Sequence, residues 1–161
     1  MTKELILTRG KVALIDDEDY WRCMQYNWTA IVSNGKWYAK RHIGGGTHQR
    51  LHNFILKTSD LLDHINGDGL DNRKSNLRKA SPHQNSMNNA KTKNRTSSKY
   101  KGVHKKGSSF VASIGHNRTT LYLGSFKTEE EAAKVYDKKA KELFGEFANL
   151  NFPSVKELEN V

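Results

Sequence analysis

Short hydrophobic runs, each about the length of a strand, fill the first 57 residues of the chain. They are ELILT, KVALID, WTAIVS, KWYAKRHI and QRLHNFIL, at residues 4–8, 11–16, 28–33, 36–43 and 49–56. Turn signals separate several of them, among them Asn34-Gly35 and a run of glycines at 44–46. Runs of this length bounded by turn residues predict strands, so we expect a small sheet here.

One segment between these runs has helical spacing instead. Tyr20, Met24 and Trp28 recur at every fourth position after an acidic start at 16–19. Side chains four residues apart share one face of a helix. The spacing therefore predicts a short amphipathic helix with these three residues on its apolar face.

Two further short runs, LLDHI at 61–65 and NLRKA at 76–80, are joined by a loop rich in Gly, Asp and Asn. Ser81 then offers a helix cap, and Pro82 suits the first position of a helix. The order predicts a ββα unit, which would bring His64, Asn76 and Asn85 close together.

The last third of the chain predicts a three-stranded antiparallel meander followed by one helix. The candidate strands are KYKGVHKK, SFVASIGH and TTLYLGSF, at 99–106, 109–116 and 119–126. Thr128 can form a capping box with Glu131, and Gly145 is typical of a helix end. The predicted helix places Ala132, Tyr136, Ala140 and Phe144 along one face.

Charge adds a partner to this picture. The chain has a formal net charge of +10, and residues 91–127 hold nine Lys or Arg and no Asp or Glu. A basic segment that nothing within it neutralises favours a polyanionic partner such as nucleic acid.

Composition also excludes some classes of protein. Cys23 is the only cysteine, so an intramolecular disulfide and zinc sites of the CxxC kind are excluded. No window approaches the roughly 20 apolar residues of a membrane span, so we expect neither insertion nor export but a cytoplasmic protein.

The polar loop carries the candidate chemistry. Asp63 and Asn85 offer carboxylate and amide oxygens, which suit a hard divalent cation such as Mg²⁺, with Mn²⁺ as the alternative. His64 offers an imidazole whose ordinary pKa of about 6.5 suits a general base near neutral pH.

Residues 51–88 resemble the HNH endonucleases, in particular the phage and intron-encoded branch whose motif opens with Asp-His. The resemblance rests on LHNFIL, DHINGD, LDN, NLR and the Asn that follows them. It implies a ββα-metal core in which Asp63 and Asn85 hold the metal ion. It also implies that His64 deprotonates the attacking water and that Asn76 braces the loop that holds His64. The implied reaction is metal-assisted hydrolysis of a phosphodiester bond.

Several residues of this motif have a second interpretation. Asp63 and Asn76 also suit plain turn formation, and His83 competes with Asn85 as the ligand on the helix. Arg73 and Arg78 are candidate clamps for DNA phosphates, or ordinary surface charges.

Other residues of the N-terminal part stay open as well. His52 either contacts the site or packs below it. The basic residues of the N-terminal sheet either contact DNA or only complete the fold; they are Lys36, Lys40, Arg41 and Arg50.

Residues 98–153 resemble the AP2 DNA-binding domain, on the matches KGV, LGSF, EEAAKVYDKKA and ANLNFP. The resemblance implies a three-stranded sheet that enters the major groove, with alternate residues of each strand facing the DNA. The implied contacts are Lys101, His104 and Lys106 on the first strand, Ser113 on the second, and Thr120 and Tyr122 on the third. Phe110, Ala112 and Ile114 are expected to face the helix instead.

Together these features predict an α+β protein: a small N-terminal sheet leading into a ββα-metal core, then a linker and an AP2-like domain. The expected bounds are 1–90 for the HNH domain, 91–98 for the basic linker, 99–153 for the AP2-like domain and 154–161 for a tail.

The predicted function is that of a homing-type endonuclease of a phage or mobile element, which nicks double-stranded DNA in a bacterial host cell. One active site per chain favours a monomer, with a dimer as the alternative. The competing interpretation is a DNA-binding regulator whose HNH part is only a scaffold, and metal dependence distinguishes the two.

Overall fold

The structure is a computed structural model that describes residues 1–88 and 97–153. The chain divides into two compact units, the first at Met1–Pro82 and the second from His83 onward. Most of the predicted linker at 91–98 and all of the predicted tail at 154–161 lie outside the described residues. Both units combine helices with small antiparallel sheets, which confirms the predicted α+β class.

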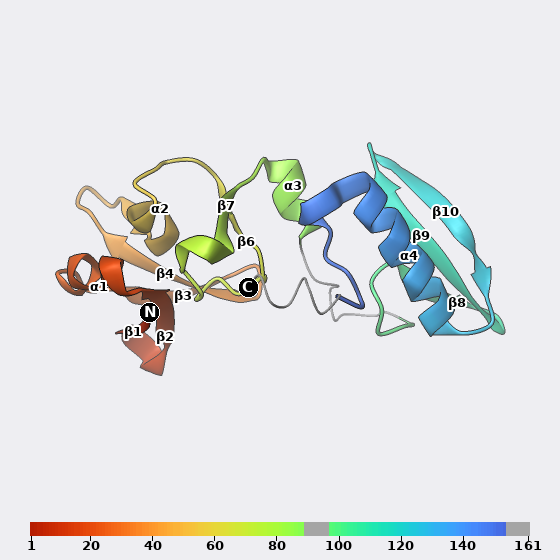
Figure 1. Ribbon diagram of the computed structural model, residues 1–161, viewed down its shortest axis with the longest axis horizontal. Coiled ribbons are helices and arrows are strands. Elements are labelled where there is room, and N and C mark those ends of the chain that lie inside the picture. The colour runs from red at the N-terminus through yellow and green to blue at the C-terminus, as the bar shows by residue number, and fades with distance from the viewer. Residues whose placement is uncertain (89–96, 154–161) are drawn as a thin grey trace. The chain divides into compact units, whose positions relative to one another are not determined.

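The first unit contains three small antiparallel sheets (Figure 1). The strands β1 (Thr2–Ile6) and β2 (Val12–Asp16) form a pair, with a 3₁₀ turn at Thr8–Gly10 between them. A second sheet has the order β3-β4-β5, at Thr29–Ser33, Lys36–His42 and His48–Arg50. Their apolar side chains meet in one core with Leu5, Ile15, Trp28 and Leu51 among its buried members.

The predicted amphipathic helix exists, but the face assigned to it was wrong. Helix α1 spans Asp17–Met24, so Trp28 lies beyond its end. Met24 is exposed, and the buried residues of α1 are Asp19 and Cys23. Trp28 is still buried, because its indole donates a hydrogen bond of 2.9 Å to the carbonyl of Cys23 and its ring enters the core.

The run at 49–56 was predicted as a strand, and this was wrong beyond Arg50. Residues Leu51–Ile55 form the short helix α2. Leu51 and Ile55 are both buried, and their spacing of four puts them on the same side of a helix. In an extended strand the same two side chains would also share a face, so five residues contain too little periodicity to decide.

The third sheet of the first unit positions the candidate site. Its strands are β6 (Leu62–His64) and β7 (Leu77–Lys79), with Asp63 opposite Arg78 and His64 opposite Leu77. A 3₁₀ turn at Lys74–Asn76 leads into β7, and helix α3 (Pro82–Met87) follows it. This is the predicted ββα order, and α3 begins at Pro82 as expected.

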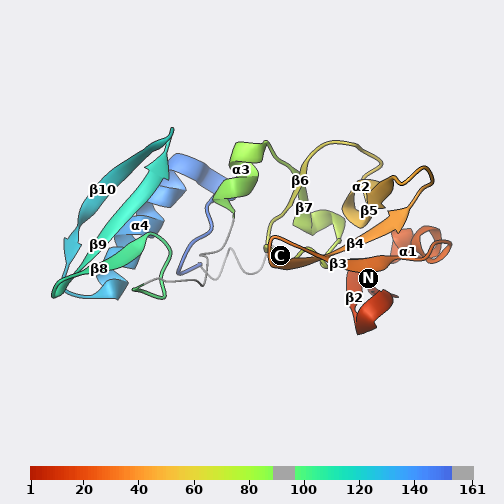
Figure 2. The same ribbon diagram turned by 180° about the vertical axis from the view of Figure 1, so that it is seen from behind.

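The second unit has a three-stranded antiparallel sheet of order β10-β9-β8. The strands span Val103–Lys106 (β8), Ser109–His116 (β9) and Thr119–Phe126 (β10). Helix α4 (Glu129–Phe144) crosses one face of this sheet, in front of it in Figure 1 and behind it in Figure 2. A 3₁₀ turn at Gly145–Phe147 follows.

The predicted helix signals of this unit are confirmed. Thr128 and Glu131 form the capping box, and Gly145 is the C-cap of α4. Tyr136 is buried on the sheet side of the helix, as are Ala132 and Ala140. Ala112 and Ile114 are buried in the same two clusters, and Phe110 packs against them, as expected.

One position was misplaced. Lys101 lies in the turn before β8 and not on the first strand. Gly102 separates the two with φ of +74°, and a Cβ at that position would come within 1.9 Å of the Tyr136 ring. The turn packs closely against α4, and the strand begins only after it, at Val103.

No helix in the described parts of the chain has an apolar stretch long enough to cross a bilayer.

Candidate active site

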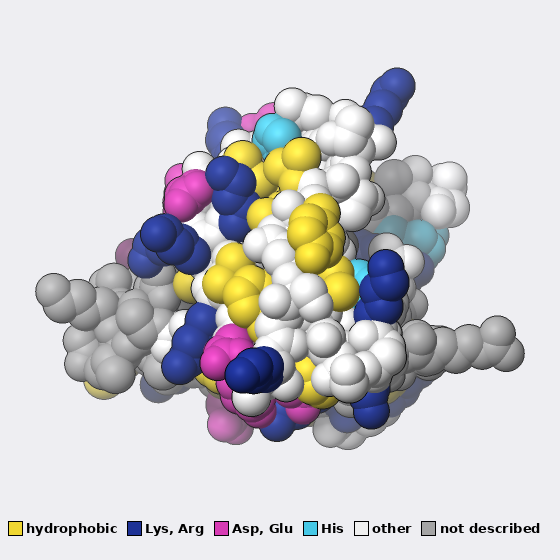
Figure 3. All heavy atoms as spheres, turned by 90° about the vertical axis from the view of Figure 1, so that its right-hand side faces the viewer, with side chains coloured by type: hydrophobic (Ala, Val, Ile, Leu, Met, Phe, Trp, Pro, Cys, Tyr) yellow, Lys and Arg dark blue, Asp and Glu magenta, His cyan; other side chains and the backbone are white. Residues whose placement is uncertain are grey.

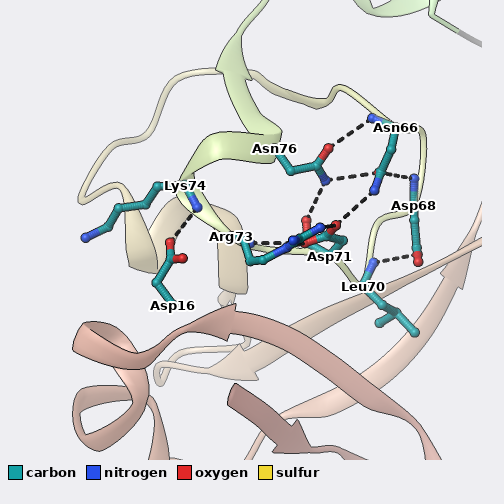
Figure 4. Close-up of polar contacts among 8 residues, drawn as sticks. All are labelled: Asp16, Asn66, Asp68, Leu70, Asp71, Arg73, Lys74 and Asn76. Carbon is teal, nitrogen blue, oxygen red and sulfur yellow. Dashed lines mark hydrogen bonds and ion pairs between the residues drawn. The ribbon is translucent and has the colours of Figure 1, made fainter. Parts of the chain in front are cut away.

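The loop between β6 and β7 is held by its own polar side chains (Figure 4). Asn76 is fully buried, and its Oδ1 accepts a hydrogen bond of 3.0 Å from the backbone amide of Asn66. Its Nδ2 donates to the Asn66 side chain at 3.0 Å and to the Asp71 carbonyl at 2.8 Å. The two ends of the loop are thereby joined around one amide group, which is the bracing position predicted for Asn76.

The middle of the loop consists of turns closed by Asp and Asn side chains. Asn66 Oδ1 accepts from the Asp68 amide, and Asp68 Oδ1 accepts from the Leu70 amide, each at 2.9 Å. The loop then runs along β2, where the Asn72 amide donates to the Leu14 carbonyl at 2.7 Å. The Asp and Asn residues therefore do form turns, and these turns fix the loop in one conformation.

Arg73 was predicted as a phosphate clamp, and the structure places it on a carboxylate of the same loop. Its Nε and Nη2 donate to the two oxygens of Asp71 at 2.8 and 2.6 Å. This ion pair raises the pKa of Arg73 and lowers that of Asp71. The adjacent Lys74 bonds through its backbone amide to Asp16 and through its ammonium to Glu18. Arg73 therefore stabilises the loop internally, and Lys74 fastens it to the rest of the unit.

His64 lies at the end of β6 with a buried imidazole. Its Nε2 is 3.4 Å from Oδ1 of Asn72, a buried amide that also donates to the Gly69 carbonyl. Burial lowers the pKa of His64, against the opposing effect of Asn72 and the nearby carboxylates. The imidazole is accordingly neutral at neutral pH, the state in which it can accept a proton.

Two aromatic rings from other elements complete the surroundings of His64. The His52 ring of α2 lies 5.0 Å from the His64 ring, and the Tyr38 ring of β4 lies 5.8 Å from it, both edge to face. Burial and the neighbouring His64 lower the pKa of His52 to about 3. His52 thus contacts the predicted base directly, which decides the question that the sequence left open.

A close approach between backbones brings Tyr38 into this cluster. A Cβ at Gly69 would lie 2.4 Å from the Trp37 carbonyl and 2.5 Å from the Tyr38 ring. Only glycine fits there, since any larger residue would push the loop away from β4.

Asp63 precedes His64 and is buried beside Arg78. Nε and Nη2 of Arg78 donate to Oδ2 of Asp63 at 3.1 and 2.8 Å, and both side chains are almost completely covered. The cross-strand register places them opposite each other. Arg78 therefore holds the carboxylate predicted to bind metal, rather than lying at the surface as a phosphate clamp would.

Of the predicted metal ligands, the first unit itself supplies one, the carboxylate of Asp63. Its orientation is fixed by Arg78. Asn85 is half-buried on α3, and His83 is exposed on the same helix; both belong to the second unit, so their relation to Asp63 stays a prediction. Among residues 1–88 and 97–153 no three His, Cys, Asp or Glu gather in a way that could hold a metal ion. An Asp and an Asn with water and phosphate as further ligands is the kind of set that Mg²⁺ accepts.

Two residues of this site were not singled out by the sequence, and a third, Arg50, was named only as a possible DNA contact of the N-terminal sheet. Asn72 orients His64, Tyr38 covers it, and Arg50 lies over the Tyr38 ring at 4.8 Å. The LDN motif contained Asn72, but only the fold of the loop brings its side chain to the imidazole.

A second candidate site is the face of the second-unit sheet that α4 leaves open. A groove of about 530 Å³ lies on it, and five of the six DNA contacts predicted for this unit line the groove. They are His104, Lys106, Ser113, Thr120 and Tyr122. Figure 3 shows a face with hydrophobic side chains along its middle and Lys and Arg side chains around them.

Lys101 is the sixth predicted contact and does not line the groove. Its ammonium donates a hydrogen bond of 2.8 Å to the carbonyl of Met87, and its backbone amide bonds to Asn151. Asn151 in turn bonds to the buried carboxylate of Asp137. Lys101 therefore belongs to the contacts that hold the C-terminal segment of this unit together.

Comparison with known proteins gives two kinds of relative. Over 134 residues, 75% of the chain, the sequence is 40% identical to an uncharacterised HNH endonuclease of Acanthamoeba polyphaga mimivirus, and the match covers 69% of that protein. No protein-family model matches the chain.

The other relatives match a shorter segment of 60 residues, 35% of the chain. This segment is 45% identical to dehydration-responsive element-binding protein 2E of Oryza sativa subsp. japonica and to ethylene-responsive transcription factor ERF018 of Arabidopsis thaliana. It spans 19% and 31% of these two proteins, so the likeness concerns one module of each. These matches fit the predicted combination of an HNH part with an AP2-like part.

Proposed function

Because the chain belongs to the HNH endonuclease family, we propose that it is a metal-dependent DNA endonuclease. In this proposal the first unit hydrolyses a phosphodiester bond, and the second unit binds the DNA. The observation that carries the proposal is a buried, neutral imidazole next to a buried carboxylate, His64 beside Asp63, on the strand that leads into a loop whose polar groups are bonded to one another.

His64 is the proposed general base. An amide oxygen can only accept a hydrogen bond, so the contact with Asn72 favours the tautomer with hydrogen on Nε2. Nδ1 is then the basic nitrogen, which takes the proton of the attacking water. Asn76 keeps the loop, and with it the position of His64, in place through its three hydrogen bonds.

Asp63 and Asn85 are the proposed metal ligands, with His83 as the rival for the position on α3. When bound, a divalent cation would neutralise charge on the phosphate and on the leaving oxygen. Arg78 positions the Asp63 carboxylate, and we propose this role for it in place of a contact with DNA. Mg²⁺ is the proposed cation, and Mn²⁺ the alternative.

The second unit is proposed to supply most of the affinity for double-stranded DNA through the groove on its sheet. Lys106 and His104 would meet phosphates, while Ser113, Thr120 and Tyr122 would face the bases. Neutralisation of phosphates makes such binding weaken as salt is raised. One candidate active site per chain supports nicking by a monomer.

We also propose that the gene belongs to a phage or mobile element and that the enzyme acts in the cytoplasm of a bacterial host. The viral source of the relative supports only the viral part of this proposal.

The test is a magnesium titration of plasmid nicking by the wild type and Asp63→Asn, with Asp60→Asn as the matched control. Asp60 is a half-exposed carboxylate that pairs with Lys79. We expect open circles with Mg²⁺ and none with EDTA, a loss of at least ~100-fold in Asp63→Asn, and little change in Asp60→Asn. Plasmid that stays supercoiled under every cation, with gel-shift binding retained, would instead support the DNA-binding regulator.

A further inference from the structure

Arg50 lies beside the candidate active site, and no ion pair is found for it within residues 1–88 and 97–153. It is the last residue of β5 and directly precedes α2. Its guanidinium lies over the Tyr38 ring, 4.8 Å from the centroid. Nη1 is completely buried and has no hydrogen-bond partner among the residues that the structure describes. A buried donor without an acceptor is unfavourable, and more so when it is charged.

Other arginines of the first unit are satisfied by protein oxygens. Those with bonded guanidinium groups are Arg22, Arg41, Arg73 and Arg78. Arg73 and Arg78 each meet a carboxylate of the candidate site, on Asp71 and Asp63. Arg50 therefore differs from these four arginines, because its Nη1 has no acceptor among the described residues.

The surroundings of Arg50 connect it to the proposed reaction centre. The Tyr38 ring that it covers also contacts the rings of His52 and His64. Burial raises the pKa of the Tyr38 hydroxyl; the charge of Arg50 opposes this shift and the charge of Asp63 adds to it, so both charges act on the same ring. His52 is neutral at neutral pH and gives Arg50 no negative charge. An anion that approached His64 and Asp63 would thus lie on one side of the Tyr38 ring, which carries a guanidinium with one buried and unsatisfied nitrogen.

We propose that Arg50 binds the phosphate of the phosphodiester bond that is cut. The proposal rests on the proposed nuclease function. A guanidinium presents several N–H groups in a planar fork that matches two oxygens of a phosphate. Stacking on Tyr38 fixes this fork beside the site. Bound phosphate would supply the acceptor that Nη1 lacks, and it would hold the scissile group close to His64.

The first test is independent of DNA cleavage. The arginine side-chain N–H resonances are followed by NMR while inorganic phosphate is added at constant ionic strength, with the Arg50 signal assigned through Arg50→Lys. We expect the Arg50 signal to move with phosphate, whereas the signals of Arg73 and Arg78 stay in place because carboxylates already hold them. An Arg50 signal that moves no more than those two would overturn the proposal.

The second test measures nicking by Arg50→Ala and Arg50→Lys, with Lys79→Ala as the control. Lys79 is an exposed cation of β7 in the same unit, and its removal costs the same charge. We expect nicking under enzyme excess to fall at least ~100-fold in Arg50→Ala and less in Arg50→Lys, with DNA binding within ~3-fold of wild type. Added guanidinium ion should restore part of the rate of Arg50→Ala, which a merely misfolded variant would not show.

The outcomes separate the two proposals. A wild type that nicks DNA, together with an Arg50→Ala variant that nicks as fast as Lys79→Ala, would remove Arg50 from the site and leave the nuclease intact. A wild type that cuts nothing while phosphate still moves the Arg50 signal would leave an anion site and refute the nuclease.

Discussion

Asn76 offers the sharpest test of how the candidate site is built. Its side chain is fully buried and makes three hydrogen bonds, one accepted from Asn66 and two donated to Asn66 and Asp71. Asn76→Ala removes all three and leaves the buried Asp71 carbonyl without this donor. At about 1 kcal/mol for each bond, with a further 1 kcal/mol or so for the unpaired carbonyl, we expect a loss of about 3 to 5 kcal/mol.

An isosteric variant separates hydrogen bonding from volume. Asn76→Asp keeps the acceptor for the Asn66 amide but places an oxygen where Nδ2 now faces two oxygens. We therefore expect it to be at least as destabilising as Asn76→Ala, although the side-chain volume hardly changes. Asn27→Ala is the control, since Asn27 is exposed and such surface changes usually lie within ~0.5 kcal/mol.

Urea unfolding followed by tryptophan fluorescence is the appropriate assay. All three tryptophans, Trp21, Trp28 and Trp37, lie in the first unit, so the signal reports on that unit alone. For a unit of this size a slope of about 1 kcal/mol per molar urea predicts a midpoint lower by roughly 3 to 5 M. A decrease of less than 1 kcal/mol in Asn76→Ala, or equal effects of Asn76→Ala and Asn27→Ala, would refute the bracing role.

Three further predictions follow from single contacts. Gly102→Ala would place a Cβ against the Tyr136 ring, so it should unfold the second unit and abolish gel-shift binding. Urea unfolding of the first unit, followed by tryptophan fluorescence, should stay unchanged, and retained DNA binding would contradict the prediction. The folded pKa of His52, about 3, lies below its unfolded value of 6.5, so the unfolded chain alone binds a proton as the pH falls below 6.5. The free energy of unfolding should then drop by about 2 kcal/mol from pH 7 to pH 5, and His52→Phe should remove this part of the drop, whereas parallel pH curves would argue against it. Tyr122→Ala, at an exposed position of the groove, should weaken DNA binding by about 1 to 3 kcal/mol and leave the salt dependence unaltered; an unchanged affinity would exclude the groove as the contact surface.

The second unit was the easier part to predict, because its strands are long enough for alternation to show. Ser113 and Tyr122 line the groove, and Ala112 and Ile114 face the helix, as the period of two requires. Lys101 was misplaced because the tight turn at Gly102 depends on the distant Tyr136 ring, which no local pattern reveals.

The candidate site was predictable only for residues inside the motif. Asp63, His64 and Asn76 lie where the ββα order puts them. The pairing of Asp63 with Arg78 depends on the register of two strands across a long loop. Arg50 and Tyr38 reach the site from another sheet, and His52 from a helix too short to show periodicity. Such contacts arise from the tertiary fold, so sequence spacing alone does not contain them.

The most direct test of the central claim compares how fast the wild type and His64→Ala convert supercoiled plasmid to open circles in Mg²⁺. The reaction is run with enzyme in excess, and a gel shift confirms that both proteins occupy the DNA equally. Loss of a general base should slow this step by about 100-fold to 10,000-fold, while His42→Ala, which changes an exposed histidine, should match the wild type. Equal rates for His64→Ala and the wild type would contradict the assignment of His64 as the base that activates water.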